Sequence, residues 1–237
     1  MRLSLLFPAI LLTGLIGIAL PPAVAAQTPV PCDSVNDPFN RLHPDRWDEV
    51  LLLSPLPGSV RAENGRLLLE TTDHDPHEIQ VYSLFTLSGD FDIQVDYNVP
   101  AENPSLTPCR FNGGLVVQTV DDRLGYKAYV SSKPDRRLLF RGRLDRFGED
   151  NLEKYQIRPA PDTGVLRLTR RDGRIVFRAW VDGEWDVVYP FRERCREELR
   201  VRFKLQTGGK TETPQACPVT LALDNFKVNH CGKLVMK

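Results

Sequence analysis

The sequence predicts an all-β protein, an antiparallel β-sandwich or jelly roll. Apolar and polar residues alternate in short runs along most of the chain, and no long stretch has helical periodicity. In VLRLTRRDGRIVFRAWVDGEW, residues 165–185, the pairs Asp172-Gly173 and Asp182-Gly183 divide three such runs. An Asp-Gly pair between alternating runs is typical of a tight hairpin turn, because both residues tolerate positive φ. This segment therefore predicts a three-stranded meander.

Turn signals separate the alternating runs elsewhere, among them Ser88-Gly89-Asp90 and Asn112-Gly113-Gly114. The expected strands cover residues 48–53, 65–71, 79–86, 91–99, 114–120, 126–131, 137–143, 165–170, 174–181, 185–189, 199–206 and 219–228. Many short strands with Gly, Pro and Asp between them, and no low-complexity linker, predict a single sandwich domain over residues 27–237.

Alternation also assigns the side chains of two strands to opposite faces. The residues expected between the two sheets are Phe91, Ile93, Val95, Val201, Phe203 and Leu205. The opposite faces carry acids in one strand, such as Asp92, and bases in the other, Arg200, Arg202 and Lys204. We expect these charged faces to be solvated, and to pair with each other if the two strands are neighbours. A polar ligand surface is the alternative.

Residues 1–26 are predicted to be a secretory signal peptide. Arg2 precedes a long apolar run that ends in Ala23-Val24-Ala25-Ala26, which predicts cleavage after Ala25 or Ala26. An uncleaved membrane anchor is the alternative, but the prolines and the small residues favour cleavage. The expected location is therefore secreted, periplasmic or extracellular, with no membrane contact after cleavage.

All five cysteines follow this segment, and export favours their pairing. They are Cys32, Cys109, Cys195, Cys217 and Cys231. We expect Cys32 to pair with Cys231, because chain ends often lie close together in compact domains. The odd number leaves one cysteine free or intermolecular, and the absence of a C-x-x-C motif argues against a zinc site.

The overall charge excludes few partners. Lysines plus arginines equal aspartates plus glutamates, at 31 each, which disfavours a nucleic-acid partner. Arginines cluster within residues 136–146 and 192–202, but acids lie between them. The expected role is a solvated face with salt bridges, and an anion-binding face is the alternative.

Five segments in order resemble the concanavalin A-like lectin/glucanase superfamily. They are residues 45–47 with 58–67, 88–95, 112–117 with 124–129, 166–173 with Trp185, and 223–228. The resemblance covers nearly all of the chain after residue 26 and implies the jelly-roll fold. It does not imply one activity, because lectins, glycosidases, lyases and adhesion modules share this fold.

Retaining glucanases of this superfamily carry E-x-D-x-x-E on one strand, where the two glutamates flank the scissile bond. Glu184-Trp185-Asp186 begins like this motif, but the second glutamate is missing, and Glu149, Asp150 and Glu153 lie in a stretch expected to be a loop. No catalytic residue is therefore predicted. His74 and His77, with Asp73 and Asp75, offer a zinc or calcium alternative, but exposed hairpin residues are expected there, so no metal or cofactor is predicted.

Aromatic and polar side chains on an open sheet face can bind sugar by stacking and hydrogen bonding. Alternation gives five candidate ligand-binding residues, Gln118, Tyr129, Arg141, Arg178 and Trp180. Packing is the alternative role for Trp180, and Trp47 and Trp185 are expected in the core.

The expected function is a secreted, non-catalytic carbohydrate-binding or cell-surface recognition module with a polysaccharide or glycan partner. One alternative is a carbohydrate-active enzyme, a glycoside hydrolase or polysaccharide lyase, for which the arginines and Tyr129 would suit an acidic polysaccharide. A structural or protein-interaction domain is the other alternative.

Overall fold

The computed structural model describes residues 30–52, 58–71, 78–99, 111–132, 136–144, 151–157, 160–181, 183–207 and 218–236. Within them lie thirteen strands and one short 3-10 helix. The elements are η1 (Cys32–Val35), β1 (Trp47–Leu52), β2 (Ser59–Glu63), β3 (Arg66–Thr71), β4 (Glu78–Asn98), β5 (Phe111–Thr119), β6 (Leu124–Ser131), β7 (Arg137–Leu144), β8 (Asn151–Ile157), β9 (Thr163–Arg171), β10 (Arg174–Val181), β11 (Glu184–Arg194), β12 (Leu199–Thr207) and β13 (Val219–Met236).

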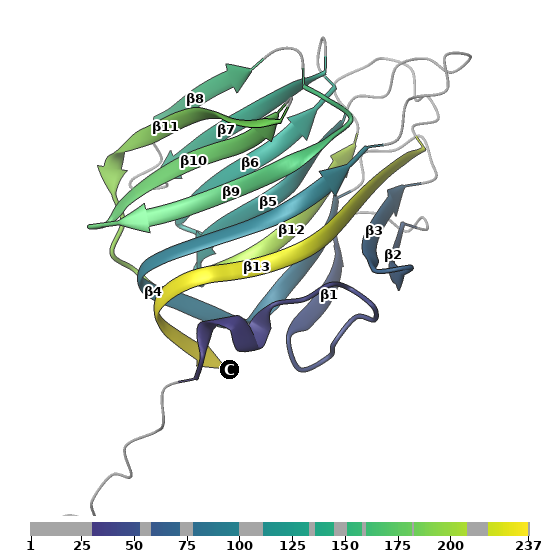
Figure 1. Ribbon diagram of the computed structural model, residues 1–237, viewed down its shortest axis with the longest axis horizontal. Helices are drawn as coiled ribbons and strands as arrows, with labels where there is room; N and C mark the ends of the chain where they lie inside the picture. The colour runs from purple at the N-terminus through teal and green to yellow at the C-terminus, as the bar shows by residue number, and fades with distance from the viewer. Residues whose placement is uncertain are drawn as a thin grey trace, which may run out of the picture.

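The strands form two antiparallel layers that share one strand (Figure 1). The first part of β4 pairs with β1 and β12, and the ladder continues through β5, β6, β7 and β8; we call this layer the β5–β6 sheet. The second part of β4 pairs with β9 and β13, and that ladder extends to β10 and β11 on one side and to β3 and β2 on the other; this layer is the β9–β10 sheet. The predicted β-sandwich is confirmed.

Aromatic contacts between the two sheets fill the core. Phe140 of β7 stacks on Phe177 of β10 with ring centroids 4.9 Å apart, and Tyr126 of β6 lies 5.0 Å from Phe191 of β11. The six residues predicted between the sheets are all buried there, namely Phe91, Ile93, Val95, Val201, Phe203 and Leu205. Strict alternation therefore assigned the core face of these strands correctly.

The turn predicted at Ser88-Gly89-Asp90 is wrong, because β4 continues through it. Gly89 has φ +68°, a conformation that L side chains rarely adopt, and it lies where the strand passes from one sheet to the other. The fully buried Arg170 of β9 donates to the carbonyl oxygens of Gly89 at 2.5 Å and of Glu197 at 2.6 Å. The guanidinium therefore binds backbone oxygens at the place where β4 bends.

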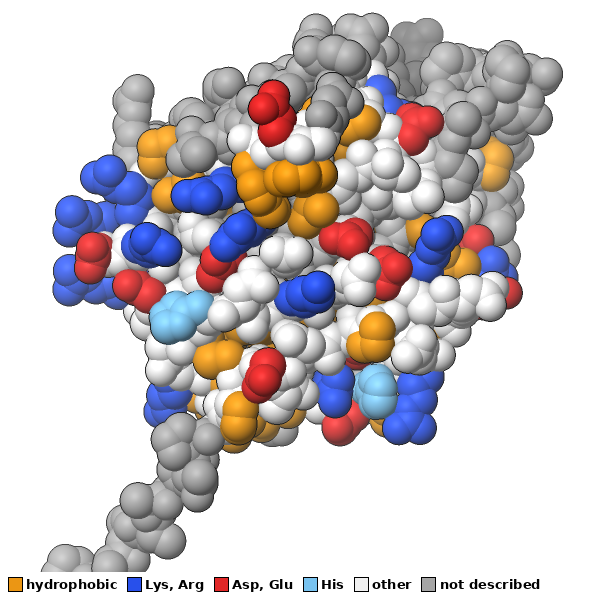
Figure 2. Space-filling view, in the orientation of Figure 1, with side chains coloured by type: hydrophobic (Ala, Val, Ile, Leu, Met, Phe, Trp, Pro, Cys, Tyr) orange, Lys and Arg blue, Asp and Glu red, His pale blue; other side chains and the backbone are white. Residues whose placement is uncertain are grey.

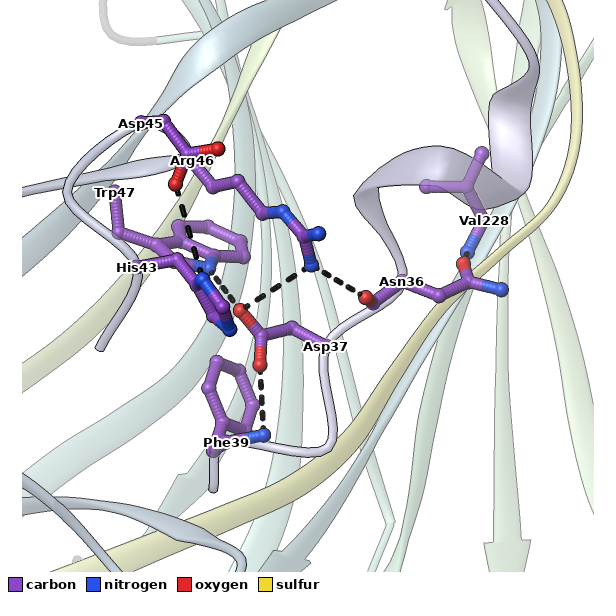
Figure 3. A network of polar contacts seen from close by, with 8 residues as sticks. All are labelled: Asn36, Asp37, Phe39, His43, Asp45, Arg46, Trp47 and Val228. Atoms are coloured by element: carbon purple, nitrogen blue, oxygen red, sulfur yellow. Dashed lines mark hydrogen bonds and ion pairs between the residues drawn. The ribbon is translucent and has the colours of Figure 1, made fainter. Parts of the chain in front are cut away.

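Polar contacts attach the N-terminal segment to β13 (Figure 3), and a disulfide also joins them. The buried Asp37 accepts hydrogen bonds from the backbone N–H of Phe39 at 2.7 Å and from Nε1 of Trp47 at 2.8 Å. Asp37 also forms an isolated bridge with Phe226 of β13, and the predicted Cys32–Cys231 disulfide is confirmed. The side chain of Asp37 thus orders the segment that carries Trp47 into the core.

The hairpin turn at Asp172-Gly173 is confirmed by φ values of +50° and +76°. Two strands were missed: β2, and β8 over residues 151–157, where Glu153 was expected in a loop. Both are short: β2 alternates over only five residues, Ser59–Glu63, and β8 lacks regular apolar alternation.

The acidic segment 91–98 and the basic strand β12 are not paired with each other, so the condition for pairing between their charged faces is not met. Residues 91–98 of β4 pair with β9 and β13, whereas β12 pairs with the first part of β4. Asp92 instead accepts a hydrogen bond from Nε of Arg167 at 2.7 Å. Arg202 and Lys204 are buried rather than solvated, which corrects the expectation of an exposed basic face.

We predict that Asp37→Ala lowers the free energy of unfolding by roughly 2–5 kcal/mol, since two buried N–H donors lose their acceptor. Urea unfolding followed by circular dichroism measures the change. Asp33→Ala, at an exposed residue of η1, is the matched control and should change it by less than about 0.5 kcal/mol. Equal urea midpoints for the two variants would show that the Asp37 contacts contribute no net stability.

Candidate functional site

The outer face of the β5–β6 sheet collects polar side chains from five adjacent strands. Directly opposed residues of neighbouring strands share a face, so the registers define rows of side chains. One row is Tyr82, Arg202, Val116, Lys127 and Arg141, from β4, β12, β5, β6 and β7. The next row is Gln80, Lys204, Gly114, Tyr129 and Leu139. We call these rows, with Glu78, Gln118 and Arg200, the cationic face.

Positive charge dominates this face. It carries Lys127, Arg141, Arg200, Arg202 and Lys204. Within the described parts of β4, β12, β5, β6 and β7, Glu78 is the one carboxylate on the same side. Arg202 and Lys204 are 7% and 6% exposed, so two of these charges are held away from water. Buried charges of one sign are costly unless an opposite charge or hydrogen bonds compensate them.

The acceptors that β4 contributes to this face, Glu78, Gln80 and Tyr82, are already engaged in hydrogen bonds. Lys204 Nζ lies 2.6 Å from Glu78 Oε2, and the side-chain amide of Gln80 donates to the same carboxylate. Arg202 donates to Tyr82 Oη at 3.0 Å and to Gln80 Oε1. The Arg200 guanidinium lies over the Tyr82 ring, 4.1 Å from its centroid. Glu78 is therefore engaged by Lys204 and Gln80.

Several buried donors on the cationic face have no partner among the residues that the structure describes. They are the Tyr129 hydroxyl and the Nε atoms of Arg141, Arg200 and Arg202. Leaving a buried polar group without a hydrogen bond costs about 1–3 kcal/mol. Buried donors without partners in a native protein call for an explanation. Since these donors lie on one face, a ligand that supplies acceptors there would explain them.

Burial and neighbouring cations change the proton affinities of two side chains at the centre of the face. Desolvation, then repulsion from Lys204, Arg202 and Arg141, lowers the pKa of Lys127 to about 8. Desolvation raises the pKa of the Tyr129 hydroxyl above its ordinary value. Near neutral pH, Lys127 can therefore give up its proton readily while Tyr129 keeps its own.

Gly114 lies between Lys204 and Tyr129 in this row and carries no side chain. It has φ +148°, and a Cβ added to it would lie 2.3 Å from the carbonyl oxygen of Ala128. Only glycine satisfies both conditions, so no side chain separates the Lys204 and Tyr129 positions in this row.

The five residues proposed from the sequence as one ligand site fall on two sheets. Gln118, Tyr129 and Arg141 lie on the cationic face, but Gln118 and Tyr129 are buried, at 3% and 4%, rather than exposed as expected. Arg178 and Trp180 lie on the outer face of the β9–β10 sheet, on the other side of the core. The ligand-binding role of all five stays a prediction.

Sequence reasoning did not identify Gln80 and Lys127 as site residues, and it assigned Arg202 and Lys204 a ligand-binding role only as the alternative to a solvated face. Their alternation was visible, but the alignment of β4, β12, β5 and β6 that brings them together depends on long-range pairing. A cation at every second position of 200–204, facing away from an apolar set, was the available signal.

Two tryptophans were expected in the core, and one of these predictions is wrong. Trp47 is 2% exposed and packs among phenylalanines, which confirms the prediction. Trp185 is 37% exposed, because it lies directly opposite Trp180 on the outward side of β10 and β11.

Other candidate residues lie outside the described residues or have no ligand set. His74, His77, Asp73, Asp75, Glu149, Asp150, Cys109 and Cys217 fall in undescribed segments, as do residues 1–26. In the described part of the chain, Cys195 is a buried free cysteine, and no group of three His, Cys, Asp or Glu side chains is placed to hold a metal ion. None of the described helices is long and apolar enough to cross a membrane.

No family model and no curated protein matches the sequence. Solved structures do match the fold. Bacillus licheniformis β-glucanase is similar with a TM-score of 0.60 at 12% identity, over 82% of this chain and 97% of that one. A structure from work on endo-acting O-glycanases of human gut bacteria has a TM-score of 0.62 at 12% identity, covering 85% and 98%. A pseudo β-1,3-glucanase of Mycobacterium tuberculosis has a TM-score of 0.56 at 13% identity, covering 82% and 98%.

At these identities the likeness shows the fold, and the chain has the concanavalin A-like jelly-roll fold that its sequence resembled. The expectation of a non-catalytic recognition module is contradicted, because structural neighbours with this fold are glucanases.

We predict that the free energy of unfolding rises as pH increases from about 8 towards 10.5. In this window the unfolded chain holds the Lys127 proton and the folded chain does not, so stability increases with pH, by at most about 3 kcal/mol for this group. Urea unfolding at several pH values measures the slope.

Lys127→Met should reduce this slope, and Lys227→Met, at an exposed lysine of β13, should leave it unchanged. An identical slope in Lys127→Met and the wild type would mean that the folded state does not lower the pKa of Lys127.

Proposed function

We propose that the protein is a secreted carbohydrate-active enzyme that acts on an acidic polysaccharide at the cationic face. One observation carries the proposal: buried cations and unpartnered donors gather on the outer face of the β5–β6 sheet, where the cations outnumber the carboxylates of the described residues, Glu78 of β4 and Asp48 of β1. An anionic sugar would supply the missing acceptors. The glucanase and glycanase neighbours support a polysaccharide as ligand. The Cys32–Cys231 disulfide supports an oxidising, extracytoplasmic location.

The charges on this face favour a sugar that carries carboxylates. Guanidinium groups bind carboxylates through paired N–H donors, and Arg141 and Arg202 flank Val116 and Lys127 in one row. A neutral sugar would leave these cations uncompensated.

The same residues favour elimination over hydrolysis. Hydrolysis of a glycosidic bond ordinarily uses two carboxyl groups, one on each side of the scissile bond. On the cationic face Glu78 is bound to Lys204, and Asp48 lies opposite Tyr82 on the neighbouring strand β1. Elimination from a uronate instead needs a base, a cation that neutralises the sugar carboxylate, and an acid for the leaving oxygen.

In the proposed reaction, neutral Lys127 removes the proton on C5 of a uronate residue. Arg141 and Arg202 bind the adjacent carboxylate and stabilise the negative charge that develops on it. The electron pair of the C5–H bond forms the C4–C5 double bond while the C4–O bond breaks. The Tyr129 hydroxyl, whose raised pKa keeps it protonated, donates its proton to the departing oxygen. The products are an unsaturated uronide and a new reducing end.

The test uses the purified protein with alginate, polygalacturonate, chondroitin sulfate and a neutral β-glucan. We expect ultraviolet absorbance from an unsaturated product with an acidic polymer, and a rate that increases as pH rises through about 8, where Lys127 becomes neutral. Lys127→Met should lower kcat by roughly 10²–10⁴-fold, the contribution of a positioned base.

Lys227→Met is the matched control and should keep the wild-type rate, since Lys227 lies on β13 in the other sheet. Reducing ends released from the neutral β-glucan, without ultraviolet absorbance, would show a hydrolase and overturn the elimination step. No product from any polymer would overturn the proposed function.

A further inference from the structure

A second group of exposed aromatic side chains lies on the opposite side of the molecule from the cationic face. Trp180 of β10 and Trp185 of β11 are directly opposed in register, and each is 37% exposed. Figure 2 shows a hydrophobic patch on the face formed by the β9–β10 sheet, with basic side chains beside it. The mechanism proposed above uses none of these residues.

The two indole rings are held in fixed positions. Their centroids are 5.4 Å apart with an interplanar angle of 76°, an edge-to-face contact. The Arg167 guanidinium lies over the Trp185 ring at 5.1 Å, and Asp92 accepts a hydrogen bond from Arg167 Nε at 2.7 Å. Because the aromatic pair is ordered before any ligand arrives, a ligand would lose less affinity to immobilising it.

Polar groups of the kind that bind sugar hydroxyls surround this aromatic pair. Arg178 is the neighbour of Arg167 across the strands, and its Nε is buried without a partner among the described residues. Gln94 of β4 follows Arg167 in the same row, and Asp96 is two strands away from Trp180 in the next. An aromatic platform beside an unused N–H donor and amide and carboxyl groups suits a pyranose ring, which is apolar on its faces and polar at its rim.

We propose that Trp180, Trp185 and Arg178 form a second polysaccharide-binding site, separate from the cationic face. A pyranose ring stacks on the Trp180 side of the pair, and the half-buried Arg178 guanidinium donates to a hydroxyl or carboxylate of the same polysaccharide chain. This second site rests on the proposed function in one respect, the choice of a polysaccharide as its ligand. The site would hold a long polymer against the enzyme while another part of the chain reaches the cationic face.

A second copy of the protein fits this patch less well than a glycan does. In a two-fold interface the same patch meets itself, so that like charges of the two copies approach each other. Arg171 and Arg174 are opposed in register on the same face and are both exposed, and Arg178 adds a third cation. Their mutual repulsion disfavours self-association.

Tryptophan fluorescence tests the site without any turnover. The chain has three tryptophans, and Trp47 is buried in the core, so quenching by acrylamide reports on Trp180 and Trp185. The probes are polygalacturonate, alginate and a neutral β-glucan, each titrated into the wild type and into Lys127→Met. We expect at least one polymer to shield the exposed tryptophans in both proteins.

Trp180→Ala should weaken polymer binding in affinity gel electrophoresis by on the order of tenfold, the loss expected for one stacking contact with its buried area. Arg178→Gln should weaken it as well, and Trp180→Phe should restore most of it. Met236→Ala removes a similarly exposed apolar side chain elsewhere and should have no effect.

Three results would overturn the second site: no shielding by any polymer, unchanged binding in folded Trp180→Ala and Arg178→Gln, or shielding that depends on protein concentration without polymer. The last would show an interface between copies. If the wild type binds a polymer through the tryptophans but forms no unsaturated product, the proposed function is overturned and the second site is not.

Discussion

The architecture depends on one strand that belongs to both sheets. β4 runs without interruption from Glu78 to Asn98, and its bend at Gly89 changes its partners from β12 to β9. Carbonyl oxygens at the bend need hydrogen-bond donors, and the buried guanidinium of Arg170 supplies them to Gly89 and Leu87. A charged side chain buried among main-chain oxygens is stable only when its N–H groups are used, and Arg170 donates to the carbonyls of Leu87, Gly89 and Glu197. The contact between the two sheets is thereby fixed at its hinge.

With the hinge fixed, alternation determines what each outer face presents. A shift of one residue in register would exchange the core and outer sets of a strand, so a well-packed core holds the outer side chains in place as well. Phe140 and Phe177 stack inside, and Arg141 and Arg178, the residues that follow them, consequently face outward on opposite sides of the molecule. The cationic face and the tryptophan patch therefore have the same physical origin. Neither can be moved without repacking the interior.

This origin explains which features could be predicted from the sequence. Alternation and turn chemistry are local, so the all-β fold, the core residues Phe91 and Val201 and the turn at Asp172 followed from short segments. Pairing between distant strands is not local. The cationic face joins Lys204 to residues more than seventy positions earlier, and nothing within 199–205 indicates that β5 and β6 lie beside it. The exposure of Trp185 was missed for the same reason, since its register against Trp180 decides which face it occupies.

Burying several cations on one face lowers the stability of the fold. The same burial shifts the pKa values of its side chains and makes them chemically reactive. Burial of Lys127, and then repulsion from Lys204 and Arg202, raises the energy of the charged lysine and lowers its pKa to about 8, where a base is useful near neutral pH. Replacing buried charges by hydrophobic residues of similar volume is often neutral or stabilising. The core between the sheets does not include Arg202 or Lys204, so these charges are not needed to form it. Protein sites that sacrifice stability in this way are characteristic of function rather than of packing. The location of the unpartnered donors, on the one face where the cations also gather, therefore argues that this surface serves an anionic ligand.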